Sequence, residues 1–345
     1  MKNYLFELTH PKHYYQFKDV MSRLMSNTSN NVIVIARDKD VLLNILKDEK
    51  INYIDYGKYK KSIFSKFIIL PRLLYNYYQI ARKNKINIIV SKASPYAAII
   101  SLFTKLNTVI TPDSEVVTLT KKIVAPLASV VITPDNYSLN YGSKHKKVSG
   151  LLEDCYLHPT VFTPDGSLVE KLGFSPQKPY YILRFISWDA SHDLNKYGFT
   201  NKEKIKLVQY LSKSGDVYIS SEGLLPSELE KYRIKIPASK IHHVLHFATL
   251  YVGDSQTMAT ESALLGTPSI RYNSFVGEND MSNFVLLEHK FKLLKNYSNF
   301  TDAFNCAKNF ISNSNNKMEW LNKRDNYYDC VGNINEKIFS IISSK

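Results

Sequence analysis

The sequence predicts an α/β protein with two domains, each built on a doubly wound parallel sheet. Short runs rich in Val and Ile alternate with longer segments of helical periodicity, which is typical of parallel sheets covered by helices on both faces. The alternation stops once, near the middle of the chain, and then resumes. A length of 345 residues also suits two domains of ordinary size better than one. Two such domains are expected to face a cleft.

The first series, residues 1–160, alternates strands and helices from its start. Strands are predicted at residues 4–8, 31–36, 51–57, 86–91, 107–111 and 128–134, and helices at 14–27, 39–47 and 97–104. Between them, residues 57–85 mix basic with aromatic and aliphatic side chains at helical spacing. Two interpretations fit this segment. It can lie on an anionic membrane surface, or it can be a helix with one core face and one solvated basic face.

The second series, residues 161–325, begins after a proline-containing segment at 150–165 that is typical of a hinge. Strands are predicted at residues 179–185, 216–222, 250–255 and 268–273, and helices at 202–212, 227–231, 241–248 and 258–265. The last residues, 326–345, predict an amphipathic closing helix that can pack back on the first domain.

Composition narrows the range of partners. The chain has 45 Lys and Arg against 31 Asp and Glu, a net charge of +14, which favours anionic partners such as nucleic acid, an acidic membrane or phosphorylated small molecules. A general compositional bias toward Lys explains the charge equally well. The three cysteines have no metal-ligand spacing, and their odd number argues against a disulfide framework. We therefore expect a cytoplasmic protein without a metal, whose membrane contact is peripheral because no apolar run is long enough to span.

The strongest local signal is VGDSQTMATESALLGTPSIR, residues 252–271. A buried strand ends at Gly253, and Ser255, Gln256 and Thr257 then begin a helix of small residues. Backbone N–H groups at such a helix start favour phosphate, especially at the carboxyl end of a parallel strand. An ordinary helix cap is an equally good interpretation. Glu261, one turn further, can accept sugar or ribose hydroxyls, or it can compensate the helix dipole.

Two neighbouring strands also end in polar residues. Arg184 lies at the end of strand 179–185, and its planar fork of donors suits a diphosphate. Glu222 ends strand 216–222. The loop after Arg184 carries further candidates, of which the Trp can stack on a ligand or belong to the core: Trp188, Asp189, His192 and Asp193.

In the first domain, His10 and His13 follow the first strand, and Asp113 and Glu115 follow strand 107–111. Such groups can act as a general base toward a hydroxyl. We rank Glu115 first, then Asp113 and His10; a solvated loop is the alternative for the two carboxylates. Strand 86–91 is closed by Lys92, Ser94 and Pro95.

The sequence resembles a bacterial and archaeal family of unknown function that is related to UDP-N-acetylglucosamine 2-epimerases and GT-B glycosyltransferases. The matching segments lie at residues 9–20, 36–46, 111–115, 126–135, 150–165, 181–193 and 252–271. The resemblance implies a GT-B fold of two Rossmann-like domains, with Ser255, Gln256 and Thr257 on the diphosphate and Glu261 on a donor hydroxyl. The epimerases have two glycines after the serine, where this chain has Gln256 and Thr257, which favours a transferase.

We therefore expect a metal-independent glycosyltransferase that moves a sugar from a nucleotide-diphosphate donor, UDP-linked, to a hydroxyl of a glycan or lipid-linked acceptor. No separate cofactor is expected, because Arg184 and the turn at residues 255–257 would stabilise the leaving diphosphate. One alternative is a sugar-nucleotide 2-epimerase or hydrolase that uses the same donor site. Others are a polyol-phosphate polymerase of the same fold and a nucleic-acid-binding module, although we expect no nucleic-acid partner.

Overall fold

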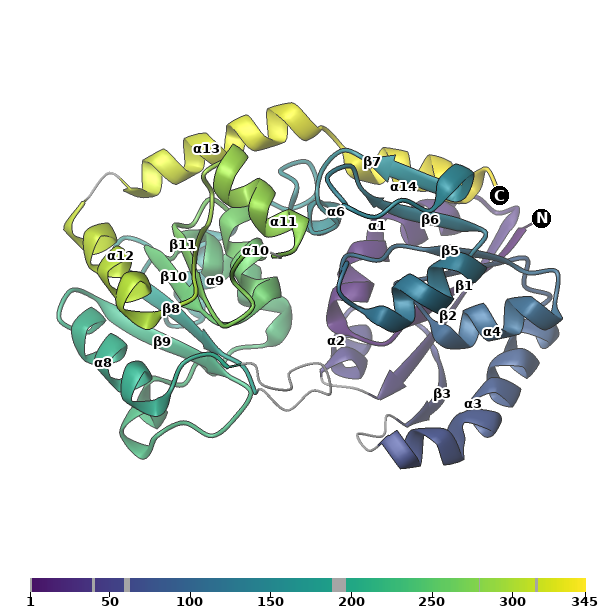
Figure 1. Cartoon of the computed structure of the whole chain (residues 1–345), viewed down its shortest axis with the longest axis horizontal. Helices are drawn as coiled ribbons and strands as arrows, with labels where there is room; N and C mark the ends of the chain where they lie inside the picture. Colours follow the sequence, from purple (N-terminus) through teal and green to yellow (C-terminus); the bar gives the residue numbers. More distant parts are fainter. Residues whose placement is uncertain (1, 39–40, 59–62, 188–196, 279, 314–315) are drawn as a thin grey trace. The chain divides into compact units, whose positions relative to one another are not determined.

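The computed structural model describes residues 2–38, 41–58, 63–187, 197–278, 280–313 and 316–345, and the chain forms two compact units. The first unit consists of Met1–His158 and Gly332–Lys345, and the second of Pro159–Val331. Each unit has one fully parallel sheet with helices on its faces (Figure 1). The predicted fold class, two doubly wound parallel-sheet α/β domains, is confirmed.

The first unit has a seven-stranded sheet in the order β3-β2-β1-β4-β5-β6-β7. Its strands are β1 Lys2–Leu8, β2 Asn30–Asp38, β3 Ile54–Lys58, β4 Ile88–Ser91, β5 Asn107–Ile110, β6 Val130–Pro134 and β7 His145–Val148. The inner strands β1 and β4 are buried almost throughout, as expected for strands covered on both faces.

The helices of the first unit include two, α1 and α4, whose starts have clear sequence signals. They are α1 Pro11–Ser26, α2 Leu42–Asp48, α3 Ile63–Lys83, α4 Pro95–Phe103, the π-helix η1 Thr120–Val124, α5 Ala125–Leu127, η2 Gly142–Lys144, α6 Asp154–Leu157 and α14 Ile334–Ser343. A proline opens α1 and α4, where its missing N–H costs nothing. The side chains of His10 and Ser94 cap these two helices by accepting backbone N–H groups.

Helix α3 has the core face that one interpretation of residues 57–85 predicts. Leu73, Tyr77 and Ala81 recur every four residues and are buried in the core of the first unit. The opposite side is solvated and exposes Arg72 and Tyr75. The segment therefore has one core face and one solvated face. None of the helices in the described ranges is long and apolar enough to cross a membrane.

The second unit has a five-stranded sheet in the order β12-β11-β10-β8-β9. Its strands are β8 Tyr180–Phe185, β9 Asp216–Ser221, β10 Leu250–Gly253, β11 Ser269–Tyr272 and β12 Lys295–Tyr297. Its helices are α7 Gly166–Lys171, α8 Asn201–Leu211, η3 Ser227–Tyr232, η4 Ala238–Lys240, α9 Ile241–Phe247, α10 Gln256–Leu264, α11 Ser282–Val285, η5 Leu286–Lys290, α12 Phe300–Ser312 and α13 Asn316–Val331. Helix α10 is buried from Ala259 to its end, and its small residues let it pack against β10, β11, α9 and α13.

Two strands are absent from the sequence-based prediction, and both lie at a sheet edge. The strand β7 has the sequence HKKV and β12 has KNY. Edge strands are covered less than central ones and do not need a continuous apolar run, so hydrophobic patterning cannot reveal them. The buried central strands of both sheets were predicted because they carry that pattern.

The C-terminal helix α14 belongs to the first unit. It packs against α1, α6 and β7, and its Ile334, Ile338 and Ile342 are fully buried. The side chain of Asn335 is also buried and donates from Nδ2 to the carbonyl oxygen of Cys155 at 2.9 Å. The chain therefore completes the core of its first unit with its last residues.

This packing makes a stability prediction. Ile338→Ala should lower the free energy of unfolding by about 2–5 kcal/mol, because it leaves a cavity at a fully buried position. Lys337→Ala is the matched control on the exposed side of the same helix and should change stability by less than about 0.5 kcal/mol. Urea unfolding followed by circular dichroism measures both, and equal effects of the two variants would show that α14 contributes no core.

Candidate functional site

Each sheet has one point where the winding of the chain reverses. In the second unit, β8 is followed by β9 on one side, and β10 then lies on the other side of β8. In the first unit the reversal lies between β1 and β4. Ligands of open α/β sheets bind outside the carboxyl ends of the strands at this point, because the connections leave in opposite directions and open a crevice. The β8/β10 and β1/β4 ends are therefore the candidate sites.

At the β8/β10 end, Asp254 holds the two strands together. Its N–H donates to the carbonyl oxygen of Arg184 at 3.1 Å, and its Oδ1 accepts from the N–H of Ile186 at 2.9 Å. Its Oδ2 accepts from the N–H of Phe199 at 3.4 Å, and the residue is 1% exposed. Asp254 thus organises the backbone of the site rather than facing a ligand.

Helix α10 starts directly after Asp254. Ser255 is its N-cap, and its Oγ accepts from the N–H of Met258 at 3.4 Å. Gln256 and Thr257 occupy the first two helical positions and are half-buried. Helical geometry gives N–H groups at these positions no acceptor within the helix, and the helix dipole makes the same end favourable for an anion. The cap is observed, and it leaves the helix start available for a phosphate.

Glu261 lies one turn into α10 and is 7% exposed. Its Oε1 is 3.3 Å from Nε2 of His242, which comes from α9 and is 6% exposed. His242 is not among the residues predicted from the sequence. The helix 241–248 was predicted, but no local pattern indicates that its second residue would lie against α10.

Arg184 and Glu222 were predicted as separate ligand contacts, and the structure brings them together as an ion pair. The two residues lie close together because β8 and β9 are neighbouring strands. Arg184 lies opposite Ser220 in their register, and Glu222 directly follows β9. Nη1 of Arg184 also donates to Oγ of Ser220 at 2.7 Å. Trp188, Asp189, His192 and Asp193, predicted in the next loop, lie outside the described residues.

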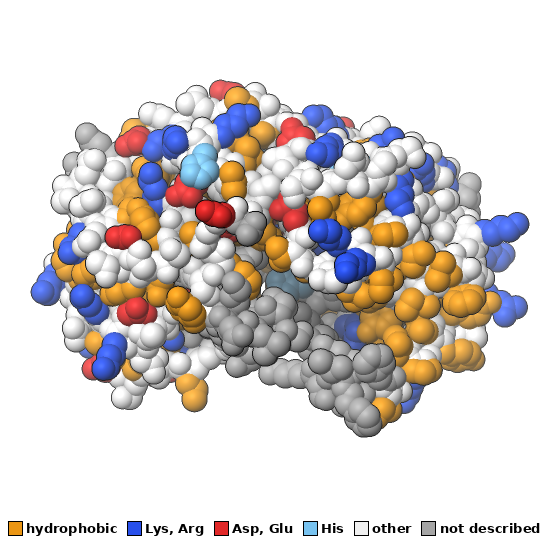
Figure 2. Space-filling model, viewed as in Figure 1, with side chains coloured by type: hydrophobic (Ala, Val, Ile, Leu, Met, Phe, Trp, Pro, Cys, Tyr) orange, Lys and Arg blue, Asp and Glu red, His pale blue; other side chains and the backbone are white. Residues whose placement is uncertain are grey.

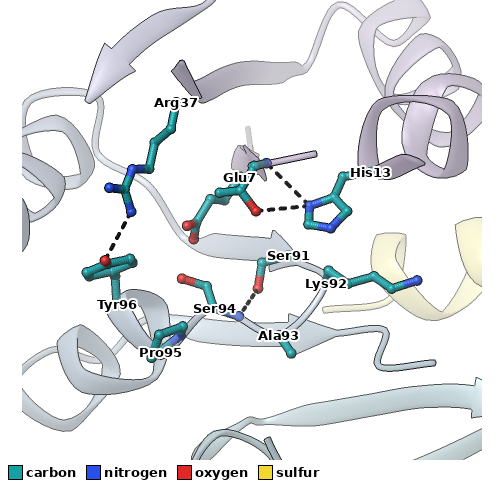
Figure 3. Close-up of a pocket in the computed structure, with 10 residues that line it drawn as sticks. Glu7, His13, Arg37, Ser91, Lys92, Ala93, Ser94, Pro95 and Tyr96 are labelled. Carbon is teal, nitrogen blue, oxygen red and sulfur yellow. Dashed lines mark hydrogen bonds between the residues drawn. The ribbon is translucent and has the colours of Figure 1, made fainter. Parts of the chain in front are cut away.

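At the β1/β4 end lies a pocket of about 320 Å³ (Figure 3). The residues that line it come from β1, β2 and β4 and from the segments that follow β1 and β4: Glu7, Thr9, His13, Arg37, Ser91, Lys92, Ala93, Ser94, Pro95 and Tyr96. Its volume lies at the lower end of the range of small-molecule sites. Its charged side chains are Glu7 on β1, Arg37 on β2 and Lys92 after β4.

His13 lines this pocket through its imidazole ring. Its Nδ1 accepts from the N–H of Thr9 at 3.3 Å (Figure 3). Burial and the neighbouring ammonium of Lys92 hold the pKa of His13 well below its ordinary value. The ring is therefore neutral near pH 7, and because Nδ1 is an acceptor its proton lies on Nε2. His13 can donate a hydrogen bond to a ligand.

Asp113 lies in a buried ionic network beside the pocket. It accepts from Lys12 Nζ at 2.6 Å and from Lys92 Nζ at 2.7 Å, and Lys12 also contacts Glu153 at 2.7 Å. Burial alone would raise the pKa of Asp113, but the two lysines hold it well below its ordinary range. A carboxylate with such a low pKa remains ionised and is a weak base.

The other two predicted bases also have structural partners. His10 caps α1, and its Nδ1 accepts from the N–H of Lys12 at 3.1 Å. Glu115 accepts from the N–H of Ser138 at 2.7 Å. Neither lines the pocket of the first unit.

Glu7 is the most buried ionisable group of the pocket. Its two carboxylate oxygens accept from the hydroxyls of Tyr56 at 2.6 Å and Tyr77 at 3.1 Å. Burial raises its pKa. Arg37 lies nearby with its guanidinium over the Tyr56 ring, 5.5 Å from the centroid, and donates to the Tyr96 hydroxyl at 3.0 Å. This cluster was not predicted, because Glu7 lies inside a strand whose neighbouring residues are apolar and buried like those of an ordinary core strand.

Among the described residues, no group of three His, Cys, Asp or Glu side chains could hold a metal ion.

Known proteins are similar to this chain in structure but not in sequence. No protein-family model matches the sequence, and no curated protein matches it. Solved structures do. UDP-GlcNAc 2-epimerase from Neisseria meningitidis, bound to UDP-GlcNAc, matches 99% of this chain and 100% of its own with a TM-score of 0.69 and 10% identity. MurG from Acinetobacter baumannii matches 100% of both chains with a TM-score of 0.60 and 14% identity.

The spinosyn rhamnosyltransferase SpnG, in complex with thymidine diphosphate, matches 99% of this chain and 100% of its own, with a TM-score of 0.63 and 8% identity. At such low identity the likeness shows the fold, which is that of GT-B enzymes. It supports the predicted structural relationship to both 2-epimerases and glycosyltransferases. It does not choose between their reactions.

The ionic network makes a prediction for pH dependence. Asp113→Asn should lower the free energy of unfolding by about 1–3 kcal/mol at pH 7, less than for a fully buried pair because Asp113 is partly exposed. The pKa of Asp113 is lower in the folded than in the unfolded chain, so its contribution is complete above about pH 5 and is lost on acidification. The difference between wild type and variant should therefore shrink at pH 3.

Urea unfolding at pH 7 and pH 3 tests this. Asp48→Asn, at an exposed position of the same unit, is the control and should change little at either pH. A difference for Asp113→Asn that is the same at both pH values would show that the carboxylate is not stabilised by Lys12 and Lys92.

Proposed function

We propose that this protein is a glycosyltransferase that transfers a sugar from a nucleotide-diphosphate donor to a hydroxyl acceptor in polysaccharide or glycoconjugate synthesis. The observation that carries the proposal is the start of α10 at the β8/β10 reversal. A helix N-terminus there favours the diphosphate, and Gln256 and Thr257 at its first two positions would add side-chain donors. Solved structures of the same fold support a nucleotide ligand, since one holds UDP-GlcNAc and another thymidine diphosphate.

Arg184 would bind the diphosphate by exchanging its partner. Its present partner, Glu222, is 48% exposed at its side chain, so the ion pair contributes little stability and the carboxylate can move into water. A diphosphate is doubly charged and is therefore a stronger acceptor than the Glu222 carboxylate for the same planar guanidinium. The positive charge would then lie where the leaving group develops its negative charge, which is how such a transfer proceeds without a metal.

Glu261 would accept a hydroxyl of the donor sugar or ribose. A carboxylate that is 7% exposed needs a partner, and His242, itself 6% exposed, supplies one at 3.3 Å. Held in this way, Glu261 would meet the donor in a fixed orientation.

The first unit would bind the acceptor. If the reaction inverts the anomeric configuration, a base must take the proton of the acceptor hydroxyl. Glu115 remains our first candidate. Asp113 is less suited because two lysines keep its pKa low, and His10 is less suited because its Nδ1 is committed to the cap of α1. His13, through Nε2, is placed to orient the acceptor within the pocket.

Donor binding is the first test. UDP and TDP should raise the melting temperature, because a ligand at 100 times its Kd adds about 2.7 kcal/mol to the free energy of unfolding. The corresponding nucleosides should not raise it, because they lack the diphosphate. The double variant Gln256→Ala and Thr257→Val should weaken binding about tenfold or more. Lys235→Ala, exposed in the same unit, is the control and should bind like wild type. Equal shifts with all three proteins would place the nucleotide elsewhere.

A specific observation also favours an epimerase. The β1/β4 pocket and its neighbourhood concentrate ionisable groups, and proton abstraction from a sugar carbon requires both an acid and a base. The UDP-GlcNAc 2-epimerase structures are similar over nearly the whole chain. Epimerisation or hydrolysis consumes a sugar nucleotide alone, whereas glycosyl transfer needs an acceptor.

Turnover therefore separates the two functions. We expect UDP-sugars to remain unchanged without an acceptor and to release UDP when a hydroxyl acceptor is added. Glu115→Gln should then lower kcat about 100-fold or more while leaving the UDP-dependent melting shift intact. Epimerised or hydrolysed sugar nucleotide in the absence of acceptor, measured by NMR, would overturn the transferase proposal. Normal turnover of Glu115→Gln would remove only the assignment of the base.

A further inference from the structure

The first unit exposes large apolar side chains on neighbouring elements. Helix α4 ends with two of them, Leu102 at 59% and Phe103 at 82% exposure. The segment before η1 and η1 itself expose four more: Val116, Val117, Leu119 and Ile123. We call these six residues the α4–η1 face.

Helix α4 packs against η1, so the six residues belong to adjoining parts of the first unit. Figure 2 shows hydrophobic side chains gathered over this part of the first unit, and exposed apolar residues of α3 continue it, since α3 also packs against α4. Folded domains rarely leave so many large apolar side chains together in water, and such a patch usually marks an interaction surface.

The segments that carry the face are basic. Residues 56–112, which contain α3 and α4, include ten Lys and Arg and no Asp or Glu, although one of the ten, Lys92, lies in the ionic network with Asp113. In η1, Lys121 and Lys122 are exposed beside the apolar Ile123. Glu115, which precedes Val116, accepts from the N–H of Ser138. The apolar side chains of η1 thus adjoin exposed lysines.

We propose that the α4–η1 face docks on an anionic lipid bilayer, with Leu102 and Phe103 in the acyl region and Lys121 and Lys122 at the headgroups. Apolar side chains next to exposed lysines match the two layers of such a surface, and each lysine near it adds about 1 kcal/mol of attraction. The purpose of docking, to reach a lipid-linked acceptor, rests on the proposed function; the docking itself does not.

This surface differs from the one suggested by residues 57–85 alone. Sequence periodicity located a basic amphipathic helix, and the structure adds α4 and η1, whose apolar side chains include Phe103 at 82% exposure.

Vesicle co-sedimentation of the full chain tests the proposal. Wild type should bind phosphatidylcholine vesicles that contain about 30% phosphatidylglycerol and should bind pure phosphatidylcholine much more weakly. Leu102→Ser with Phe103→Ser, and separately Lys121→Glu with Lys122→Glu, should each lower the partition coefficient about tenfold or more. Raising the salt concentration should weaken binding of wild type.

Matched controls lie on the second unit. Leu224→Ser removes a side chain that is 93% exposed, and Lys213→Glu with Lys235→Glu reverses two exposed charges; both should bind like wild type. Binding that is unchanged in the α4–η1 variants, or absent in wild type, overturns the proposal. So does a dimer in the absence of vesicles that Leu102→Ser with Phe103→Ser dissociates, because the face would then bind a second copy. The UDP-dependent melting shift, measured without vesicles, tests the donor site independently.

Discussion

The carboxylate and backbone of Asp254 hold together the part of the second unit on which its chemistry depends. The residue bonds to the backbone after β8, to the segment before α8 and, through its carbonyl oxygen, to Nδ2 of Asn273 after β11 at 3.1 Å. Backbone groups at the ends of parallel strands need hydrogen-bond partners. Where the winding reverses, the connections leave in opposite directions and do not cover these groups. One buried side chain satisfies several of these groups, which fixes the start of α10 relative to Arg184. Gly253 belongs to the same arrangement, because a Cβ there would lie 2.8 Å from the carbonyl oxygen of Arg184.

In the first unit, ion pairs and side-chain hydrogen bonds hold the strand ends in place. Lys12 and Lys92 reach Asp113 from α1 and from the end of β4, and Gln16 connects Lys92, at 2.9 Å, to Thr111 after β5, at 2.6 Å. These contacts hold the carboxyl ends of β4 and β5 against α1. Burial and the nearby ammonium groups of Lys92 and Lys12 hold the pKa of His13 low and keep its ring neutral. The same contacts therefore set both the structure and the electrostatics of the pocket, and the pocket is pre-organised before any ligand binds.

The sequence predicted the fold class, the central strands and the strand ends where polar residues gather, since all of these follow from local periodicity and parallel-sheet geometry. It could not predict pairings between elements. Arg184 and Glu222 were each identified, yet their ion pair depends on the β8/β9 register, and the contact between His242 and Glu261 depends on how α9 packs against α10. Glu7 was missed because a buried carboxylate inside a strand is recognised only when Tyr56 and Tyr77 are known to reach it. Polar edge strands were missed for the lack of a hydrophobic pattern.

The start of α10 is the part of the structure on which the proposed donor site depends. Glycines at the first positions of a phosphate-binding helix let a ligand approach the backbone closely, because no Cβ intervenes. Gln256 and Thr257 would keep a diphosphate slightly further from the backbone and would offer it an amide and a hydroxyl in exchange. In the transfer that we propose, these side-chain donors would reorient as the diphosphate separates from the sugar, a movement that a rigid backbone cradle does not allow.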